Sequence, residues 1–453
     1  MSEATFPLPA SVPAASTVGA PTGRIPWRVL FVVFAVLMCV NAFYATFAGG
    51  SDELGNAKSH VPSNRGNVLY VGLWLLLYAV SGWVVLRDFL RNGLDLCLLG
   101  VTPLAGYILL SAAWSANPWA SLVPAGMLVL NIVIAAALAS IVHPARFLRI
   151  FAWTNVVLVG ISLALVVVTP DTVRTDINRP GLLMTGELFG AYANKTVHGM
   201  SASIAILVLL FLPGNSPRIL RWPALGILTL GLILANSMAS VSGTLVAALA
   251  LTAARLMPRL GLVIFGTASV LSILVALSLP FIGVGEIATA LGRSADFTGR
   301  STFWPYAMDA IKERPLFGYG YLSFFNTDPF SMAWTVWERE LYFFTPDFHN
   351  SFLDILVGLG IVGGVFYLIL LFVSAGIFAH PSLERRCAYL LSAILLVFIL
   401  NSATGFLFLA HNRMSAIFQF YCLFVLCRSY RVADPLATAA WTGRVPQPRG
   451  VVR

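Results

Sequence analysis

From Trp119 to Val142 the chain reads WASLVPAGMLVLNIVIAAALASIV, without a single charged side chain. A helix rises about 1.5 Å per residue, so about 20 such residues cross the hydrocarbon core of a bilayer. The apolar residues form one continuous run and do not alternate with polar ones, which excludes the strands of a membrane barrel. The stretch therefore predicts one membrane-spanning helix.

Eleven further runs have the same character and predict a bundle of about twelve transmembrane helices. They are residues 25–48, 68–86, 94–113, 147–168, 198–212, 219–236, 240–256, 260–282, 351–379, 386–409 and 414–428. Of the 453 residues, 58% are hydrophobic and only 10% are charged. A soluble domain carries about 25% charged residues. We therefore expect an all-α polytopic membrane protein, and we exclude soluble enzymes, nucleic-acid-binding domains and secreted scaffolds.

Arginines in the short loops orient this bundle. The net charge of +9 comes from residues between the apolar runs, which indicates topology determinants and no nucleic-acid partner. The positive-inside rule predicts cytoplasmic termini and places the long segments 49–67, 169–197 and 283–350 on the external face. The loops that this rule assigns to the cytoplasm each carry two arginines: Arg87 and Arg91, Arg146 and Arg149, Arg218 and Arg221, Arg255 and Arg259, and Arg385 and Arg386.

The chain divides into five predicted parts. Residues 1–24 are a disordered cytoplasmic tail, 25–282 hold helices one to nine, 283–350 form a large periplasmic loop, 351–428 hold helices ten to twelve, and 429–453 are a second cytoplasmic tail. The large loop is too long for a simple connector, so we expect function there. Five cysteines lie in or beside apolar runs without a CxxC spacing, and they predict neither a disulfide framework nor a zinc site.

Within the large loop, residues 301–314 have the pattern of an amphipathic helix. Trp304, Ala307, Met308 and Ile311 share one face of this helix. A proline follows directly and ends it. We expect the helix to lie on the membrane surface or over a cavity.

Two arginines near the start of this helix suggest an anion site. The N-terminus that follows Arg293 and Arg300 has unpaired N–H groups and a positive dipole end, which attract phosphate. Their guanidinium groups can add charge-assisted hydrogen bonds to a phosphate or diphosphate. In the alternative interpretation, both arginines contact lipid headgroups or acidic neighbours.

His349, followed by Asn350, lies at the predicted boundary between water and membrane. A neutral imidazole there can accept a proton from a hydroxyl group. The alternative is an interfacial histidine that bonds a loop carbonyl. Lys195 opens another external helix end, where it could pair with a phosphate or extend along the interface as a snorkelling lysine.

Two further candidates lie near external helix ends. Ser242 could bond a sugar or a phosphate, or it could bond a backbone carbonyl. Arg413 occupies a short external loop and, like Ser242, is open to a purely structural interpretation. No Walker motif and no metal-ligand spacing occur, so the sequence implies neither ATP hydrolysis nor a metal or other cofactor.

Two longer motifs resemble those of the O-antigen ligase/polymerase superfamily of bacterial glycan enzymes. Residues 291–325, which contain Thr298-Gly299-Arg300, Trp304 and Pro315-Leu-Phe-Gly318-Tyr-Gly320, are similar to the signature of its large loop. The stretch His349-Asn350-Ser-Phe-Leu353, followed by Gly360 and Gly364, is similar to its second motif. The Gly-Arg…Thr-Gly-Arg spacing most resembles the exopolysaccharide-production polymerases.

The resemblance implies a metal-independent, all-helical glycosyltransferase of the GT-C type in the bacterial inner membrane, with its active site facing the periplasm. It implies an undecaprenyl-diphosphate-linked glycan as donor, and a glycan or lipid A-core as acceptor. The bilayer and other polysaccharide assembly proteins are the remaining expected partners. The diphosphate would contact Arg300 with Arg293 or Lys195, and His349 would assist the attacking hydroxyl. The remaining expected contacts with substrate are Asn350, Ser242, Trp304 and Arg413.

Three functions stay open at this point. The first is a polymerase that joins lipid-linked repeat units, and the second is a ligase that moves a glycan onto lipid A-core or a protein. The third is a flippase for lipid-linked oligosaccharides, which would line its path with charges inside the bundle. The chain departs from the family pattern at Gly243, where many members have a basic residue, and at Asn194-Lys195-Thr196, where many have His-Lys-Asn. These departures leave the second diphosphate ligand open.

Overall fold

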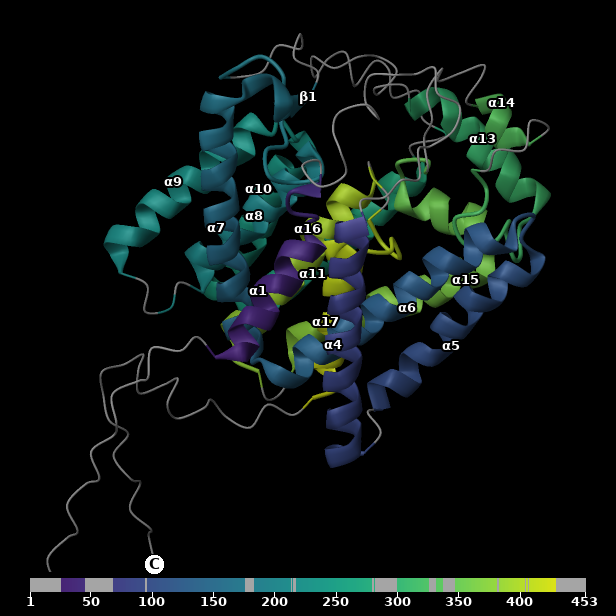
Figure 1. Ribbon diagram of the computed structural model, residues 1–453, viewed down its shortest axis with the longest axis horizontal. Helices are drawn as coiled ribbons and strands as arrows, with labels where there is room; N and C mark the ends of the chain where they lie inside the picture. The colour runs from purple at the N-terminus through teal and green to yellow at the C-terminus, as the bar shows by residue number, and fades with distance from the viewer. Residues whose placement is uncertain are drawn as a thin grey trace, which may run out of the picture.

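The computed structural model of the chain is a bundle of helices (Figure 1). It describes residues 26–44, 68–93, 96–175, 183–212, 214, 217–278, 281, 300–325, 331–336, 347–380, 383–403, 405 and 407–428. The predicted tails, 1–24 and 429–453, the external segment 49–67 and parts of the other two external segments lie outside these residues.

Each of the twelve predicted runs overlaps one helix. These helices are α1 (Trp27–Cys39), α4 (Val68–Asn92), α5 (Leu96–Leu110), α6 (Pro118–Ile141), α7 (Pro144–Val168), α8 (Lys195–Phe211), α9 (Arg218–Leu234), α10 (Met238–Leu256), α11 (Pro258–Ser278), α15 (Ser351–Ala375), α16 (Arg385–Ser402) and α17 (Met414–Leu426). Eight of them are long and apolar enough to cross a membrane, α5 together with the 3-10 turn that follows it (Cys97–Trp114), while α1, α8, α9 and α17 fall short of this length. The predicted class, an all-α polytopic membrane protein, is confirmed.

Shorter elements connect the bundle. Three 3-10 turns, η1 (Ser111–Trp114), η2 (Pro170–Thr172) and η4 (Gly376–Ala379), extend or follow longer helices. The strands β1 (Arg174–Thr175) and β2 (Glu187–Leu188) pair antiparallel, a small hairpin that the sequence did not indicate. The helices α13 (Arg300–Glu313) and α14 (Met332–Thr335) belong to the large loop, and they lie at the same end of the bundle as β1 (Figure 1).

Of the eight long apolar helices, the most buried is α16, which packs against α8, α10 and α11. Small residues allow close approach elsewhere in the bundle, as at Ala135, Ala136 and Ala137 of α6, which are almost fully buried. Large apolar side chains remain exposed around the outside, among them Trp119 at 72%. Apolar residues on both faces of most helices are typical of a protein whose solvent is lipid.

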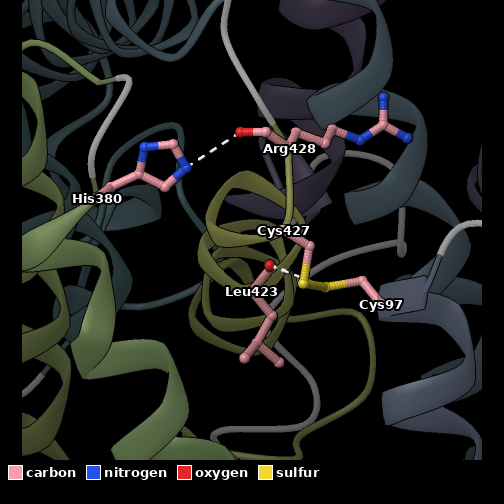
Figure 2. Close-up of a disulfide and its surroundings, with 5 residues drawn as sticks. All are labelled: Cys97, His380, Leu423, Cys427 and Arg428. Carbon is pink, nitrogen blue, oxygen red and sulfur yellow. Dashed lines mark hydrogen bonds between the residues drawn. A yellow bond between two sulfur atoms is a disulfide. The ribbon is translucent and has the colours of Figure 1, made fainter.

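A disulfide joins Cys97, at the start of α5, to Cys427, directly after α17, across 330 residues of sequence (Figure 2). This bond corrects the expectation of no disulfide, which rested on the spacing of cysteines along the chain. The carbonyl oxygen of Leu423 lies 3.1 Å from Cys97 Sγ. Next to it, the Arg428 guanidinium binds the Asp88 carboxylate at 2.9 Å, so the end of α17 is fixed to both α4 and α5.

Candidate active site

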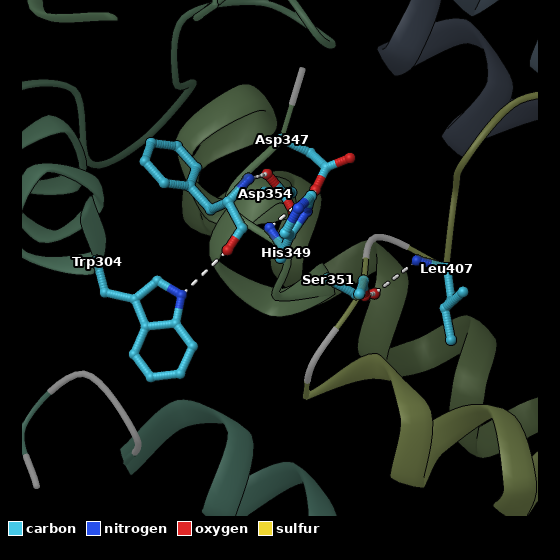
Figure 3. A network of polar contacts seen from close by, with 8 residues as sticks. Trp304, Asp347, His349, Ser351, Asp354 and Leu407 are labelled. Carbon is cyan, nitrogen blue, oxygen red and sulfur yellow. Dashed lines mark hydrogen bonds and ion pairs between the residues drawn. The ribbon is translucent and has the colours of Figure 1, made fainter. Parts of the chain in front are cut away.

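His349 lies in the short segment that leads into α15, and its backbone has a left-handed φ of 54°. Its ring Nδ1 contacts Oδ1 of Asp347, and its backbone N–H donates to the same oxygen at 2.8 Å (Figure 3). The His349 side chain is 36% exposed, whereas that of Asp347 is 12% exposed. A carboxylate bonded to Nδ1 fixes the orientation of the imidazole and favours the tautomer with its proton on Nδ1. In that tautomer Nε2 is the nitrogen that can accept a proton.

The charge on Asp347 is set by two opposing influences. Burial by itself raises the pKa of this carboxyl group. The adjacent His349 and the guanidinium of Arg413 favour the carboxylate more strongly, so the pKa of Asp347 lies below its usual value. Asp347 is therefore ionised at neutral pH and can stabilise a positive charge on the ring of His349.

A second carboxylate, Asp354, holds the same segment from the first turn of α15. Its Oδ1 accepts the backbone N–H of Phe348 at 2.7 Å (Figure 3). Asp354 Oδ2 is buried without a hydrogen-bond partner among the described residues, and Asp354 lines a small, largely apolar cavity. A non-glycine residue with positive φ is rare, and such a conformation persists only where surrounding contacts fix it. Asp347 and Asp354 supply these contacts on either side of His349.

Asn350 is the N-cap of α15 and is fully buried. Its Oδ1 accepts from the backbone N–H groups of Phe352 and Leu353, and its Nδ2 donates to the carbonyl of Ala276 at 2.8 Å. The Asn350 amide thereby fixes the start of α15 against the end of α11, because an N-cap side chain satisfies helix N–H groups that lack a partner. The expected substrate contact by Asn350 stays a prediction.

Helix α13 confirms the predicted amphipathic pattern. Trp304, Ala307 and Ala310 are buried on the face that packs against α15. Trp304 is only 1% exposed, and its Nε1 donates to the carbonyl of Phe348 at 3.0 Å (Figure 3). A substrate contact by Trp304 stays a prediction, and what the structure shows is this bond to the backbone. It links α13 to the residue that precedes His349.

Arg300 is the first residue of α13, so the expected helix N-terminus lies at this position. Its side chain, and Arg293 as a whole, lie outside what the structure describes. The bond between Trp304 and Phe348 places the first turn of α13 close to the His349 segment. The role of the two arginines stays a prediction.

The motif from Pro315 to Gly320 packs into a break in α15. Gly360 has φ 66° and ψ −170°, which interrupts the helix. The backbone N–H of Gly320 donates to the carbonyl of Gly358 at 2.8 Å. In the other direction, the N–H of Ile361 donates to the carbonyl of Pro315 at 2.8 Å. A Cβ at Gly360 would lie 2.2 Å from the carbonyl oxygen of Leu316. The glycines of both motifs thus allow the backbone of residues 315–320 to pack directly against the backbone of α15.

Two other expected residues have different surroundings. Lys195, at the start of α8, forms an ion pair with Glu187, whose side chain is 1% exposed. Ser242 is exposed on α10 and its hydroxyl bonds the carbonyl of Ala239. The buried hydroxyls of that motif belong to Ser240 and Thr244, which face α8 and α16. Substrate contacts by Lys195 and Ser242 stay predictions.

Arg413 lies in the loop between α16 and α17, which is anchored next to His349. Ser351, two residues after His349, donates its hydroxyl to the carbonyl of Gly405 at 2.7 Å and accepts the backbone N–H of Leu407 at 2.9 Å (Figure 3). The positive charge of Arg413 acts on Asp347. The loop that carries Arg413 is therefore bonded to the segment that carries His349, although the two are far apart in the sequence.

Asp347 and Asp354 are the functional candidates that the sequence interpretation missed. A signal was present, because an acidic residue two positions before a histidine can reach its ring, and one four positions after an N-cap can reach back over the first turn. Both residues stand in the stretch PDFHNSFLD, residues 346–354.

Two comparisons with known proteins bear on this site. Residues 223–368 match the family model for O-antigen ligase, a range that holds α13, the glycine motif and His349. The chain is 27% identical over 312 residues to the exopolysaccharide production protein ExoQ of Rhizobium meliloti (strain 1021), across 65% of this chain and 67% of that protein. These findings confirm the resemblance to the O-antigen ligase/polymerase superfamily, and they support an enzyme role in glycan processing.

Proposed function

We propose that this protein is a membrane glycosyltransferase that polymerises undecaprenyl-diphosphate-linked oligosaccharide repeat units into a surface polysaccharide or exopolysaccharide. The observation that carries the proposal is the contact between the Asp347 carboxylate and Nδ1 of His349. The similarity to an exopolysaccharide production protein favours polymerisation over other glycan transfers. The reaction would take place at the periplasmic face, at the end of the bundle that carries α13.

The proposed step is a direct displacement. Nε2 of His349 accepts the proton of an acceptor sugar hydroxyl while its oxygen attacks the anomeric carbon of the donor. The bond from that carbon to the diphosphate oxygen breaks, and the diphosphate leaves with the electron pair. Asp347 stabilises the imidazolium that forms. A single displacement inverts the anomeric centre, so a product with retained configuration would contradict this mechanism.

Diphosphate is a good leaving group, so the protein has to orient two substrates and neutralise developing negative charge. Arg300 at the N-terminus of α13 suits this role, because helix N–H groups and a guanidinium both attract phosphate oxygens. We propose that the reaction needs no metal.

A ligase for lipid A-core or a protein acceptor is the second candidate. The matched family model, described as O-antigen ligase, favours it. Both functions use the same donor and the same general base, and they differ only in the acceptor.

A product assay with purified full-length protein tests the proposal. Lipid-linked repeat units are supplied as both donor and acceptor, and products are separated on a gel. The native protein should produce a ladder of lengthening glycans. His349→Gln should reduce the initial rate by about 10²-fold or more, since a positioned base contributes about 10²–10⁴-fold. His380→Gln is the matched control, because His380 lies beyond the opposite end of α15, where its Nε2 bonds the Arg428 carbonyl (Figure 2).

The outcomes separate the candidates. A ladder that His349→Gln loses and His380→Gln retains supports the polymerase. Transfer that appears only after lipid A-core is added would make the protein a ligase. A full ladder from His349→Gln would contradict the role of His349.

A further inference from the structure

The disulfide between Cys97 and Cys427 joins the two ends of α5 and α17 that lie away from His349. These helices have 15 and 13 residues, so each spans about 20 Å at about 1.5 Å per residue. The neighbouring loop carries Arg87 and Arg91, which follow the pattern that predicts a cytoplasmic face for this end. Thiols in that compartment are kept largely reduced, so a disulfide there responds to the redox conditions of the cell.

Cys427 is the accessible member of the pair. It is exposed, whereas Cys97 is buried. The other three cysteines, Cys39, Cys387 and Cys422, are free and buried. An external thiol therefore reaches the disulfide at the sulfur of Cys427. Exposed disulfides tend to be labile and regulatory, whereas structural disulfides resist reduction.

The structure also holds a hydrogen-bond acceptor for the reduced form of Cys97. The carbonyl oxygen of Leu423 lies 3.1 Å from Cys97 Sγ, within reach of a thiol S–H. The same oxygen accepts the backbone N–H of Cys427 at 3.2 Å, and a carbonyl oxygen has lone pairs for two donors. A thiol on Cys97 therefore has a partner in place, and its burial costs little free energy.

Non-covalent contacts hold the end of α17 independently of the S–S bond. The Arg428 guanidinium binds the Asp88 carboxylate of α4 at 2.9 Å. The Arg428 carbonyl oxygen lies 3.0 Å from Nε2 of His380 (Figure 2). The Cα atoms of Cys97 and Cys427 are 6.1 Å apart, a distance that a disulfide spans. The two sulfurs therefore stay neighbours after reduction, and the bond can form again.

The linked helices bond segments of the candidate active site at their other ends. Directly after α5, the Ser111 hydroxyl accepts the backbone N–H of Tyr321 at 3.0 Å, next to the glycine motif. In the first turn of α17, the Ser415 hydroxyl donates to the Leu407 carbonyl at 2.6 Å, in the loop that is bonded to the start of α15. Helix α15 packs against both α5 and α17. A change where α5 meets α17 can therefore reach the site through packed helices.

We propose that Cys97 and Cys427 form a thiol–disulfide switch, which a low-molecular-weight thiol opens and the corresponding disulfide closes. In the closed form, a covalent bond links α5 to α17, and both helices hold α15 in the position that the structure shows. In the open form, only non-covalent contacts remain at this end, so α17 and the loop before it gain freedom. The inference goes beyond the proposed function and holds for any reaction at that site.

The exchange uses glutathione as reductant and glutathione disulfide as oxidant. A glutathione thiolate attacks Cys427 Sγ, the S–S bond breaks, and its electron pair goes to Cys97 Sγ, which takes up a proton. A second thiolate attacks the glutathione sulfur of the mixed disulfide, and Cys427 leaves as a thiolate that is then protonated. The products are two protein thiols and one glutathione disulfide, and the two thiol protons of glutathione end on the cysteines. Closure is the reverse exchange.

Thiol labelling of the folded, full-length protein in detergent tests the switch. The protein is treated with reduced glutathione or with glutathione disulfide, and it is then labelled with a maleimide polymer that shifts its mobility on a gel. The oxidised protein should take no label, because its three free cysteines are buried. The reduced protein should take one label, at Cys427, and the variant Cys427→Ser should take none.

Thermal unfolding and backbone amide exchange measure the effect on the fold. Reduction should lower the Tm by about 5 °C, because a disulfide that closes a long loop constrains the unfolded chain. Amide exchange should become faster in residues 347–353 and 407–413. The matched control is the double variant Cys97→Ser and Cys427→Ser, which lacks the bond. Its Tm and its amide exchange should be the same with either form of glutathione.

Three results would overturn the inference. The first is a disulfide that reduced glutathione leaves intact in the folded protein, which would make the bond purely structural. The second is a protein that keeps five free thiols after treatment with glutathione disulfide. The third is unchanged amide exchange in residues 347–353 upon reduction, whatever happens to the Tm. One label that Cys427→Ser removes, together with a lower Tm and faster exchange that the double variant does not show, supports the switch.

Discussion

Oδ1 of Asp347 accepts both the backbone N–H and the ring Nδ1 of His349. One carboxylate oxygen therefore fixes the left-handed backbone of His349 and the orientation of its imidazole together. A displacement of the Asp347 carboxylate would disturb both the backbone and the ring of His349, because the two depend on the same acceptor. This coupling makes Asp347 the residue on which the proposed base most depends.

Asp347→Asn should lower the rate of glycan transfer on the order of 10²-fold, since an amide can no longer stabilise the imidazolium. Asp309→Asn is the matched control, because Asp309 is exposed on α13 and pairs only with Lys312 among the described residues. Initial rates at saturating donor provide the measurement. Equal rates in the two variants would show that Asp347 does not act through His349.

The pH dependence of stability reports on the same carboxylate. The pKa of Asp347 is lowered in the folded protein, so its ionised form contributes stability above its ordinary pKa near 4. This contribution is lost as pH falls through the lower folded-state pKa. Between about pH 5 and pH 2, the Tm of the native protein should fall more steeply than that of Asp347→Asn. Parallel curves from thermal unfolding would contradict the assignment.

Trp304→Phe keeps an aromatic ring in the core but removes the bond to the Phe348 carbonyl. The unfolding free energy should drop by about 1 kcal/mol, the net value of one hydrogen bond. Activity should fall further than this loss of stability explains, since Phe348 precedes His349. Trp119→Phe, on the exposed start of α6, serves as the control. If Trp304→Phe keeps full activity, α13 does not position the base through this bond.

Gly360→Ala tests the break in α15. The new Cβ would lie 2.2 Å from the Leu316 carbonyl oxygen, and the backbone conformation there is almost confined to glycine. We expect a loss of about 2 kcal/mol or more in stability, read as a lower Tm. Gly226→Ala in α9 has open space around its Cβ and should be neutral or slightly stabilising. Similar Tm values for both variants would show that the break is not needed.

The sequence interpretation identified His349 and Arg413 as candidates, and the structure brings them to one end of the bundle. It could not assign Asn350, because N-capping and substrate binding use the same amide atoms. It could not separate Ser242 from its buried neighbours Ser240 and Thr244, since the rotation of α10 depends on what packs against it.

Membrane insertion was determined by the sequence alone. The hydropathy of a continuous run such as Trp119–Val142 depends only on the residues in that run. Each helix also satisfies the hydrogen bonds of its own backbone without help from the rest of the chain. The tertiary structure alone decided which distant groups meet: the Ser351 hydroxyl with the Gly405 carbonyl, Cys97 with Cys427, and the Trp304 indole with the Phe348 carbonyl. Such contacts depend on how far helices are rotated and shifted against one another, and local composition leaves that rotation open.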